Sequence, residues 1–223
     1  MVKVYYAEDA SFWEESILFA HMDQIEEKRR KACEQMKGSH DKARRLGAGL
    51  LLHYALCDYL QLPTKETPPF LTCQGQWGKP YLEEYPNVYF NLSHSGRYVC
   101  CAVGGQEVGV DIQEHRNSRS GIAQRFFTNE DNSLLRSLGE DQAQEMFFRI
   151  WSIRESYVKL TGRGLSQGLA SFQIDWQHKA LTEQEQAAAY FAETSKLPGY
   201  SFCVCSRQEK MEPAWIKMEL SDM

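Results

Sequence analysis

The chain has 223 residues, of which 43% are hydrophobic and 25% are charged, a composition that allows an apolar core in one large domain or two small ones. No apolar run approaches the ~18 residues of a membrane-spanning helix, and the N-terminal residues contain no apolar signal core. We therefore expect a cytoplasmic protein with no membrane partner. The seven cysteines are scattered and include no CxxC pair, so we expect reduced thiols and no structural zinc site.

The net charge of −5 is unevenly distributed along the chain. Eight basic residues and only two acids lie between Lys28 and Arg45. In a protein that is acidic overall, one basic segment favours a small anionic ligand over a long polyanion such as nucleic acid. A solvated helix face explains the same charges without any ligand, so the segment alone leaves both interpretations open.

The first half of the chain predicts a strand, two helices and then a group of strands. Residues 2–6 alternate like a strand, and the pattern from about 11 to 37 is helical up to Gly38. Leucines near the 3.6-residue period predict a second helix over 40–60. A stretch rich in proline and glycine follows that helix. The next predicted elements are strands at 88–90, 98–103 and 107–112, forming a meander that turns at Gly104-Gly105.

The second half predicts helices followed by strands. A short helix is expected over 120–127, an N-cap at Thr128, and the longest helix over 140–161 with Gly162 as its C-terminal stop. Short strands are then expected near 171–176, 200–205 and 214–218. This order predicts an α+β fold with two halves of similar size, residues 1–103 and 104–223, each a small antiparallel sheet packed with helices.

A carboxylate stands near the end of one predicted strand, in the sequence Val108-Gly109-Val110-Asp111-Ile112-Gln113. Side chains alternate along a strand, so the three aliphatic residues face a core while Asp111 and Gln113 share the opposite face, ~7 Å apart. An acid and an amide at that spacing can reach one hard cation or one anchored water. Gly109 allows another backbone or a ligand to approach closely. A strand end facing solvent is the simpler alternative.

The predicted long helix contains the sequence Trp151-Ser152-Ile153-Arg154-Glu155-Ser156-Tyr157-Val158-Lys159. Glu155 and Lys159 are spaced i,i+4, so they lie on one face and in the favourable order for an ion pair. An exposed ion pair explains them equally well. However, Trp151 lies one turn earlier on the same stripe, which places Glu155 near the buried edge of the helix.

Two shorter motifs contain residues that suit phosphate oxygens. Residues 91–96, NLSHSG, are expected to form a turn after a strand, where Ser93, His94 and free backbone N–H groups can bind phosphate. Turn capping is the alternative, and a serine hydrolase is less favoured because GxSxG is absent and no aspartate is placed to orient the histidine. Lys79, in Gly78-Lys79-Pro80, indicates little alone. The absence of GxxxxGK[ST] and GxGxxG argues against P-loop and Rossmann proteins.

Together these motifs resemble the 4′-phosphopantetheinyl transferase superfamily, and more closely its surfactin-synthetase-activating type than the shorter holo-acyl-carrier-protein synthase type. The family pattern is a (V/I)G(V/I)D word followed later by W-(S/C)-x-(K/R)-E-(A/S)-x-x-K, which residues 108–111 and 151–159 match. The resemblance spans residues 1–175. Other segments that occur in the family's order are the basic segment, Gly78-Lys79-Pro80, residues 91–95, Arg125-Phe126-Phe127 and residues 162–166, GRGLS.

The resemblance implies an Mg²⁺-dependent enzyme that transfers the 4′-phosphopantetheine arm of coenzyme A to a serine of an acyl or peptidyl carrier protein and releases adenosine 3′,5′-bisphosphate. It also implies two halves related by a pseudo-twofold axis, with coenzyme A at their interface. The catalytic residues it implies are Asp111, Glu155, Lys159 and His94. The metal ligands it implies are Asp111, Glu155 and Gln113. The coenzyme A contacts it implies are Lys28, Lys31 and Arg44 at the 3′-phosphate, Lys159 at the diphosphate, and Lys79, His94 and the preceding Ser93 as further phosphate contacts.

Two positions depart from the family pattern. Gln113 stands where the bacterial archetype has a third acid, so we expect weaker metal affinity. Arg154 stands where lysine is frequent, and we expect little effect because both are cations. The alternatives to an enzyme are a coenzyme A-binding module without catalysis and a nucleic-acid-binding protein that uses residues 28–45. The even division into two halves within one chain favours a working monomer. The acidic net charge and the absence of an aromatic-basic motif argue against a nucleic-acid partner.

Overall fold

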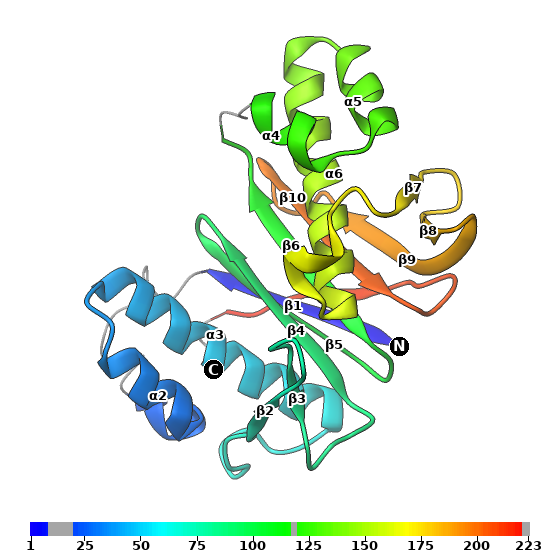
Figure 1. The fold of residues 1–223 in the computed structure, drawn as a ribbon. Helices are drawn as coiled ribbons and strands as arrows, with labels where there is room; N and C mark the ends of the chain where they lie inside the picture. The colour runs from blue at the N-terminus through cyan, green and yellow to red at the C-terminus, as the bar shows by residue number, and fades with distance from the viewer. Residues whose placement is uncertain (9–19, 117–119, 220–223) are drawn as a thin grey trace.

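A computed structural model of the chain describes residues 1–8, 20–116 and 120–219. Of the predicted first helix, residues 11–19 lie outside the described residues, and the described remainder forms a 3-10 turn and a short helix. The elements in chain order (Figure 1) are β1 (Val2–Glu8), η2 (Met22–Gln24), α2 (Glu27–Glu34), α3 (Ser39–Leu60), β2 (Thr72–Gln74), β3 (Pro80–Leu82), β4 (Tyr89–Ser95), β5 (Tyr98–Gly104), β6 (Val108–Glu114), α4 (Ser120–Phe126), α5 (Asn129–Arg136), α6 (Glu140–Thr161), η3 (Gly164–Gln167), β7 (Gln173–Asp175), β8 (Ala180–Glu183), β9 (Gln186–Thr194), β10 (Tyr200–Ser206) and β11 (Ala214–Lys217).

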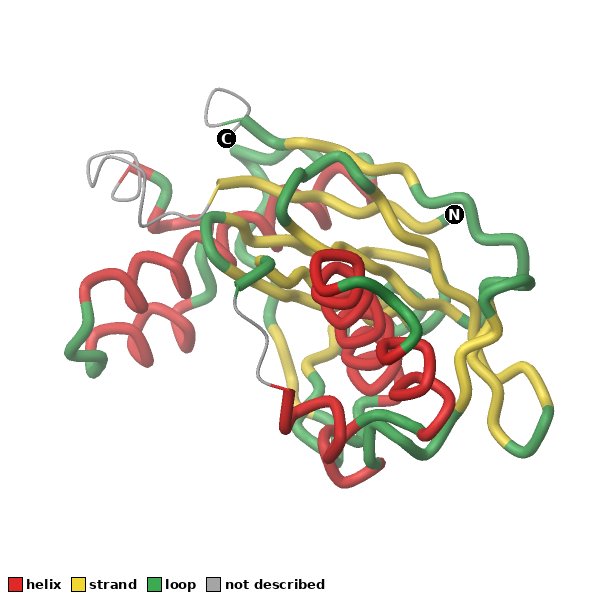
Figure 2. The backbone as a smooth tube through the Cα atoms, turned by 90° about the horizontal axis from the view of Figure 1, so that it is seen from above, coloured by secondary structure: helices red, strands yellow, loops and turns green. Residues whose placement is uncertain are grey.

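Two sheets and two long helices form the body of the protein. The first sheet has the strand order β11-β1-β5-β4 and the second has the order β6-β10-β9-β8-β7, while β2 and β3 form a separate hairpin. Helix α3 packs on β5 and β1, whereas α6 packs on β6 and β10. Figure 2 shows the helices, in red, gathered in two separate groups beside the yellow strands. The layers therefore run in the order α3, first sheet, second sheet and α6.

The apolar core explains why β5 is buried on both faces. Val99, Cys101 and Val103 join a cluster with the apolar residues of α3. Cys100 and Ala102 point the other way and join a second cluster. That cluster also contains the three aliphatic residues of β6, each at most 1% exposed. The predicted inward face of β6 is thus confirmed, and it packs against the first sheet.

The predicted α+β class with two halves is confirmed, because each sheet has one long helix on its outer side. The β1–β11 pair is parallel, whereas the other strand pairs are antiparallel. Strand β11 comes from the second half of the chain and completes the first sheet. The proposed boundary between residues 103 and 104 remains a prediction. The two sheets do not divide the chain strictly at that point, because β11, near the C-terminal end, belongs to the first sheet.

One expectation about strand pairing was wrong, and two strands were not predicted. Strand β6 does not continue the β4–β5 hairpin as a meander, but crosses to the second sheet and pairs antiparallel with β10. The crossing lets its aliphatic face pack against the first sheet, which a third strand in the same sheet would not allow. Strands β8 and β9 were not predicted, since their alanine, glutamine and glutamate content favours a helix. Burial of Ala189 and Phe191 beneath α6 overrides that preference.

The boundaries of the predicted helices in the second half of the chain follow the sequence closely. Helix α6 spans Glu140–Thr161 as predicted and ends at Gly162, whose φ of 72° is the left-handed conformation of a helix stop. Thr128 caps α5 through a capping box with Asp131.

Among the described residues, no helix is long and apolar enough to cross a bilayer. The seven cysteines are free thiols.

Candidate active site

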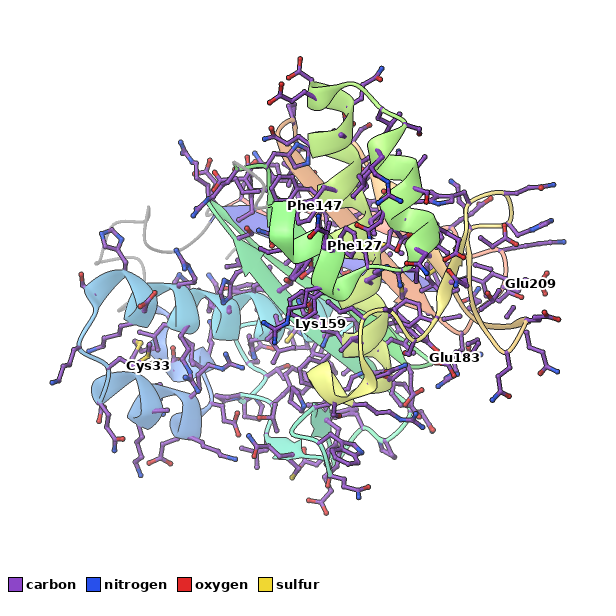
Figure 3. The ribbon with its side chains drawn as sticks, turned by 45° about the horizontal axis from the view of Figure 1, so that its top comes forward. Cys33, Phe127, Phe147, Lys159, Glu183 and Glu209 are labelled. Carbon is purple, nitrogen blue, oxygen red and sulfur yellow. The ribbon has the colours of Figure 1, made fainter. Side chains whose placement is uncertain are left out.

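Asp111 lies where β4, β6 and α6 meet. The residue is 5% exposed, and its carboxylate faces α6 because the neighbouring Val110 and Ile112 point into the core between the sheets. Lys159 Nζ donates to Asp111 Oδ1 at 2.6 Å, and Ser93 Oγ donates to the same oxygen at 2.9 Å. Lys159 Nζ also donates to Ser93 Oγ at 2.8 Å. Figure 3 shows Lys159 in the middle of the molecule, between the two groups of helices.

The second carboxylate oxygen of Asp111 is buried without a hydrogen-bond donor. Among the described residues nothing donates to Asp111 Oδ2. A buried acceptor left unsatisfied costs about 1–3 kcal/mol, and more when it is charged. A bound water or an ion would remove that cost, so this oxygen is a candidate ligand position.

Glu155 shares the site with Asp111. Burial raises the pKa of the Glu155 carboxyl above its usual range, and the negative charge of Asp111 raises it further, while Lys159 offsets only part of the shift. Burial alone would lower the pKa of Lys159, but the charge of Asp111 and its hydrogen bond outweigh burial and raise it. The predicted convergence of the two acids is therefore supported by their electrostatic interaction, and the ammonium of Lys159 acts on both.

Close packing of α6 on β6 creates this site. A side chain at Gly109 would place its Cβ 2.0 Å from the carbonyl oxygen of Ser156, so only glycine lets the helix backbone lie against the strand, as the sequence predicted. Ser152, fully buried, donates from Oγ to the carbonyl of Asp111 at 3.1 Å. The sequence did not identify Ser152 as important, although it occupies the second position of the tryptophan motif.

The segment from Asn91 to Ser95 is not the turn that the sequence predicted. It belongs to strand β4, paired with β5. Because side chains alternate along a strand, Ser93 faces Asp111 while His94 lies on the opposite face of the strand and is exposed. The local prediction failed because serine and asparagine favour turns when only sequence neighbours are considered.

Lys79 lies away from the carboxylate pair. Its ammonium donates to the carbonyl oxygens of Val108 at 3.0 Å and Leu160 at 2.7 Å. Burial lowers the pKa of Lys79 to about 8. The ammonium therefore connects the start of β6 to the end of α6, and its predicted role as a phosphate contact remains a prediction.

The predicted 3′-phosphate contacts lie on α2 and at the start of α3, outside the carboxylate site. Lys28 is exposed. Lys31 pairs with Glu27 at 2.7 Å on the surface of α2. Arg44 is half-buried, with its Nη1 at 3.8 Å from Asp41. These cations are accessible to an anionic ligand, and their assignment remains a prediction.

The donor set around Asp111 fits a magnesium ion. Mg²⁺ usually takes one or two protein carboxylates and completes its shell with water and substrate phosphates. Asp111 and Glu155 are the two protein carboxylates here. Gln113 lies on the same face of β6 as Asp111, because side chains alternate along a strand. The described residues contain no group of three or more His, Cys, Asp or Glu that could hold a metal ion. An ion held here would therefore depend on water and on the oxygens of the ligand.

Arg154 is more specialised than the sequence suggested. Its side chain is 0% exposed, and its guanidinium donates to the Asp131 carboxylate and to the carbonyls of Leu169 and Phe172. Arg154 on α6 thus connects this helix to the start of α5 and to the loop after η3. It does so one residue before Glu155. A lysine ammonium cannot reproduce this planar fork, so these contacts argue against the expected mild change.

Replacement of Arg154 by lysine should lower the free energy of unfolding by about 2–3 kcal/mol, because it leaves buried acceptors unsatisfied. Urea denaturation followed by tryptophan fluorescence measures the change. Arg149→Lys is the matched control: Arg149 lies on the same helix and binds Glu193 from a side chain that is 35% exposed, so its loss should stay below about 1 kcal/mol. Equal losses in the two variants would contradict the structural role of Arg154.

Comparison with known proteins identifies the family. The family model described as "4'-phosphopantetheinyl transferase superfamily" matches residues 107–205, and the model "4'-phosphopantetheinyl transferase, N-terminal" matches residues 13–106. The chain therefore belongs to the 4′-phosphopantetheinyl transferase superfamily and is an enzyme of that class.

Its relatives confirm the surfactin-synthetase-activating type. The chain is 32% identical over 189 residues to the 4′-phosphopantetheinyl transferase Sfp of Bacillus subtilis (strain 168), covering 83% of each chain. It is 33% identical to psf-1 of Bacillus pumilus, over 81% of this chain and 78% of the relative. The crystal structure of Thermotoga maritima holo-[acyl-carrier-protein] synthase matches 47% of this chain and 64% of that chain, with a TM-score of 0.39 and 14% identity.

Proposed function

We propose that this enzyme transfers the 4′-phosphopantetheine arm of coenzyme A to a serine of an acyl or peptidyl carrier protein, in an Mg²⁺-dependent reaction that releases adenosine 3′,5′-bisphosphate. The observation that supports it best is the unsatisfied, buried Oδ2 of Asp111 beside Glu155 and Lys159. The proposal includes a working monomer in the cytoplasm, without nucleic acid or a membrane as partner.

The reaction needs positioning and charge neutralisation more than covalent participation of the protein. The serine oxygen of the carrier forms a bond to the phosphorus of the pantetheine phosphate, and the bond from that phosphorus to the adenosine bisphosphate breaks. Glu155 accepts the serine proton, directly or through a water. Lys159 then turns its ammonium towards the diphosphate.

Asp111, Glu155 and Gln113 would hold the metal ion. When bound, Mg²⁺ supplies positive charge to the diphosphate oxygens as the bond to the leaving group breaks. Ser93 and Lys159 both bind Asp111 Oδ1, which leaves Oδ2 directed to the ion.

The remaining coenzyme A contacts are proposed from the matching positions. Lys28, Lys31 and Arg44 would bind the 3′-phosphate through the basic surface of α2 and α3, where local positive charge suits an anion of several charges. Lys79 and His94 would also contact phosphates of coenzyme A, His94 from the face of β4 opposite Asp111. For Lys79 this requires its ammonium to exchange one of its two carbonyl acceptors for a phosphate oxygen.

The decisive experiment is intact-mass spectrometry of apo carrier domains from fatty acid, polyketide, nonribosomal peptide and lysine pathways, incubated with the enzyme, coenzyme A and Mg²⁺. A gain of one phosphopantetheine on at least one carrier is expected. Coenzyme A binding measured by calorimetry, without a mass gain on any carrier, would instead support a binding module without catalysis. Tight, salt-sensitive binding of DNA or RNA without coenzyme A binding would support the nucleic-acid alternative.

Gln113→Glu should lower the Mg²⁺ concentration needed for half-maximal activity by several-fold, because a third carboxylate adds charge at the proposed metal site. Steady-state rates across an Mg²⁺ titration measure this. Gln106→Glu, at an exposed position outside the site, adds the same charge and should leave the titration unchanged. An unaltered Mg²⁺ titration for Gln113→Glu would remove Gln113 from the metal shell.

A further inference from the structure

Strands β4 and β6 lie side by side but belong to different sheets. Side chains of β4 join them where main-chain pairing is absent. The N–H groups of Val110, Ile112 and Glu114 donate, in that order, to Asn91 Oδ1 at 2.9 Å, Ser93 Oγ at 3.4 Å and Ser95 Oγ at 3.0 Å. We call this row of contacts the side-chain seam.

The side-chain seam provides hydrogen-bond partners for the main-chain groups along the edge of β6 that no described strand pairs with. Residues two apart present their backbone groups to the same side of a strand, so these three N–H groups form one row, and the Val108 carbonyl precedes them in it. That carbonyl accepts a hydrogen bond from Lys79. Buried backbone groups are almost always paired, so the first half of the chain supplies four side chains to the edge of the second sheet.

The lengths of these side chains increase along the seam. Serine side chains bind the N–H groups of Ile112 and Glu114, and the longer asparagine side chain binds the N–H of Val110. The much longer lysine side chain binds the carbonyl of Val108. Lys79 lies just before β3, so only the asparagine and the two serines start from β4. The longer reach needed at Val110 indicates a wider gap between the strands there than at Ile112 and Glu114. A cavity of about 510 Å³ opens towards the start of β6, lined by Lys79, Phe90, Glu107 and Gly162 among others. The seam is therefore a wedge whose shape depends on which side chain fills each position.

Asp111 lies between two of these contacts. The Ser93 contact at Ile112 is part of the site itself, because Ser93 also binds Asp111 and Lys159. Asn91, 8% exposed, holds only the backbone on the other side of Asp111, at Val110. Its backbone contact is thus adjacent to the carboxylate, although no hydrogen bond within the described part of the chain joins the amide to that carboxylate.

We propose that Asn91 is a positioning residue, which sets the place of the Asp111 carboxylate by holding the Val110 N–H at the correct point of the wedge. The inference rests on the proposed role of Asp111 in the transfer reaction. Loss of the amide oxygen lets the β6 backbone move at Val110, so the Asp111 carboxylate leaves its alignment with Lys159 and with the ion. A displacement of that kind lowers the turnover number more than it weakens coenzyme A binding, because the basic surface on α2 and α3 is unchanged.

The test compares Asn91→Ala with Ser95→Ala, which removes the same kind of contact at Glu114, beyond Asp111. Asn91→Ala should lower kcat by about tenfold or more and raise the Mg²⁺ concentration for half-maximal activity, while KM for coenzyme A stays within about twofold. Ser95→Ala should leave kcat and the Mg²⁺ requirement within about twofold. Equal kinetic effects in the two variants, or wild-type kinetics for Asn91→Ala, would overturn the proposal.

The variant Asn91→Ser tests whether the gap between β4 and β6 requires the longer asparagine side chain. It also replaces Asn91→Ala in the test if the alanine variant does not fold. A serine keeps an oxygen but is too short for this part of the seam, so kcat should fall as in Asn91→Ala. Full activity would overturn the wedge. Hydrogen–deuterium exchange gives a readout independent of activity: the Val110 amide should exchange faster in both Asn91 variants and the Glu114 amide faster in Ser95→Ala. If these rates rise as expected while the wild-type enzyme modifies no carrier, the seam stands and the proposed function fails. Unchanged rates overturn the seam.

Discussion

Replacing Glu155 with glutamine is expected to lower kcat for carrier modification by about 10²-fold or more. Glutamine keeps the size of the side chain but can neither accept the serine proton nor supply charge to an ion. The cost is specific to this position because Glu155 is the carboxylate whose pKa is raised by burial and by Asp111. Rates of phosphopantetheine transfer at saturating coenzyme A and Mg²⁺ measure it. Glu145→Gln, an exposed acid on the same helix, should retain full activity.

Replacing Asp111 with asparagine tests the other acid of the site, which lies on strand β6. The amide keeps an acceptor for Lys159 and Ser93 but removes the charge at the unsatisfied oxygen, so a loss of similar size is expected. In the metal-free protein, the pKa of Glu155 should also fall in this variant, because one of the two causes that raise it is absent. Near-normal transfer by both variants would mean that the reaction takes place elsewhere in the protein.

The sequence predicted the two acids because each lies in a regular element with a clear period. Alternation in β6 separated Asp111 from its aliphatic neighbours, and the i,i+4 spacing on α6 placed Glu155 with Lys159. Both elements have boundaries and faces set mainly by local pattern, and the structure follows them. Their meeting across the chain came from the family resemblance, since periodicity contains no information about which helix covers which strand.

The parts that sequence reasoning missed depend on contacts between elements far apart in the chain. The alternating polar residues of β4 look like a turn until β6 lies beside them and needs acceptors for its N–H groups. The role of Arg154 depends on Asp131 and on carbonyls that the fold brings to it. A weak signal was present in both cases: polar residues at every second position indicate a strand with one polar face, and an arginine within an otherwise buried stretch of helix indicates a partner.

Gly109→Ala is expected to cause the largest loss of stability, about 3 kcal/mol or more in the free energy of unfolding. The added Cβ would lie 2.0 Å from Ser156 O and 2.4 Å from Leu160 N. Both are main-chain atoms in the middle of α6, so no side-chain rotation can relieve the contact. The helix must move away from β6, or β6 must leave its register with β10.

Either movement should also disrupt the active site, because Glu155 and Lys159 move with the helix while Asp111 stays with the strand. Urea denaturation and transfer rates are therefore expected to change together in Gly109→Ala. Gly105→Ala is the matched control, since its added Cβ would meet only Tyr59 Oη, at an ordinary contact of 3.6 Å. A stable, fully active Gly109→Ala enzyme would show that α6 does not lie directly on β6, and the distances from which the site is built would then be wrong.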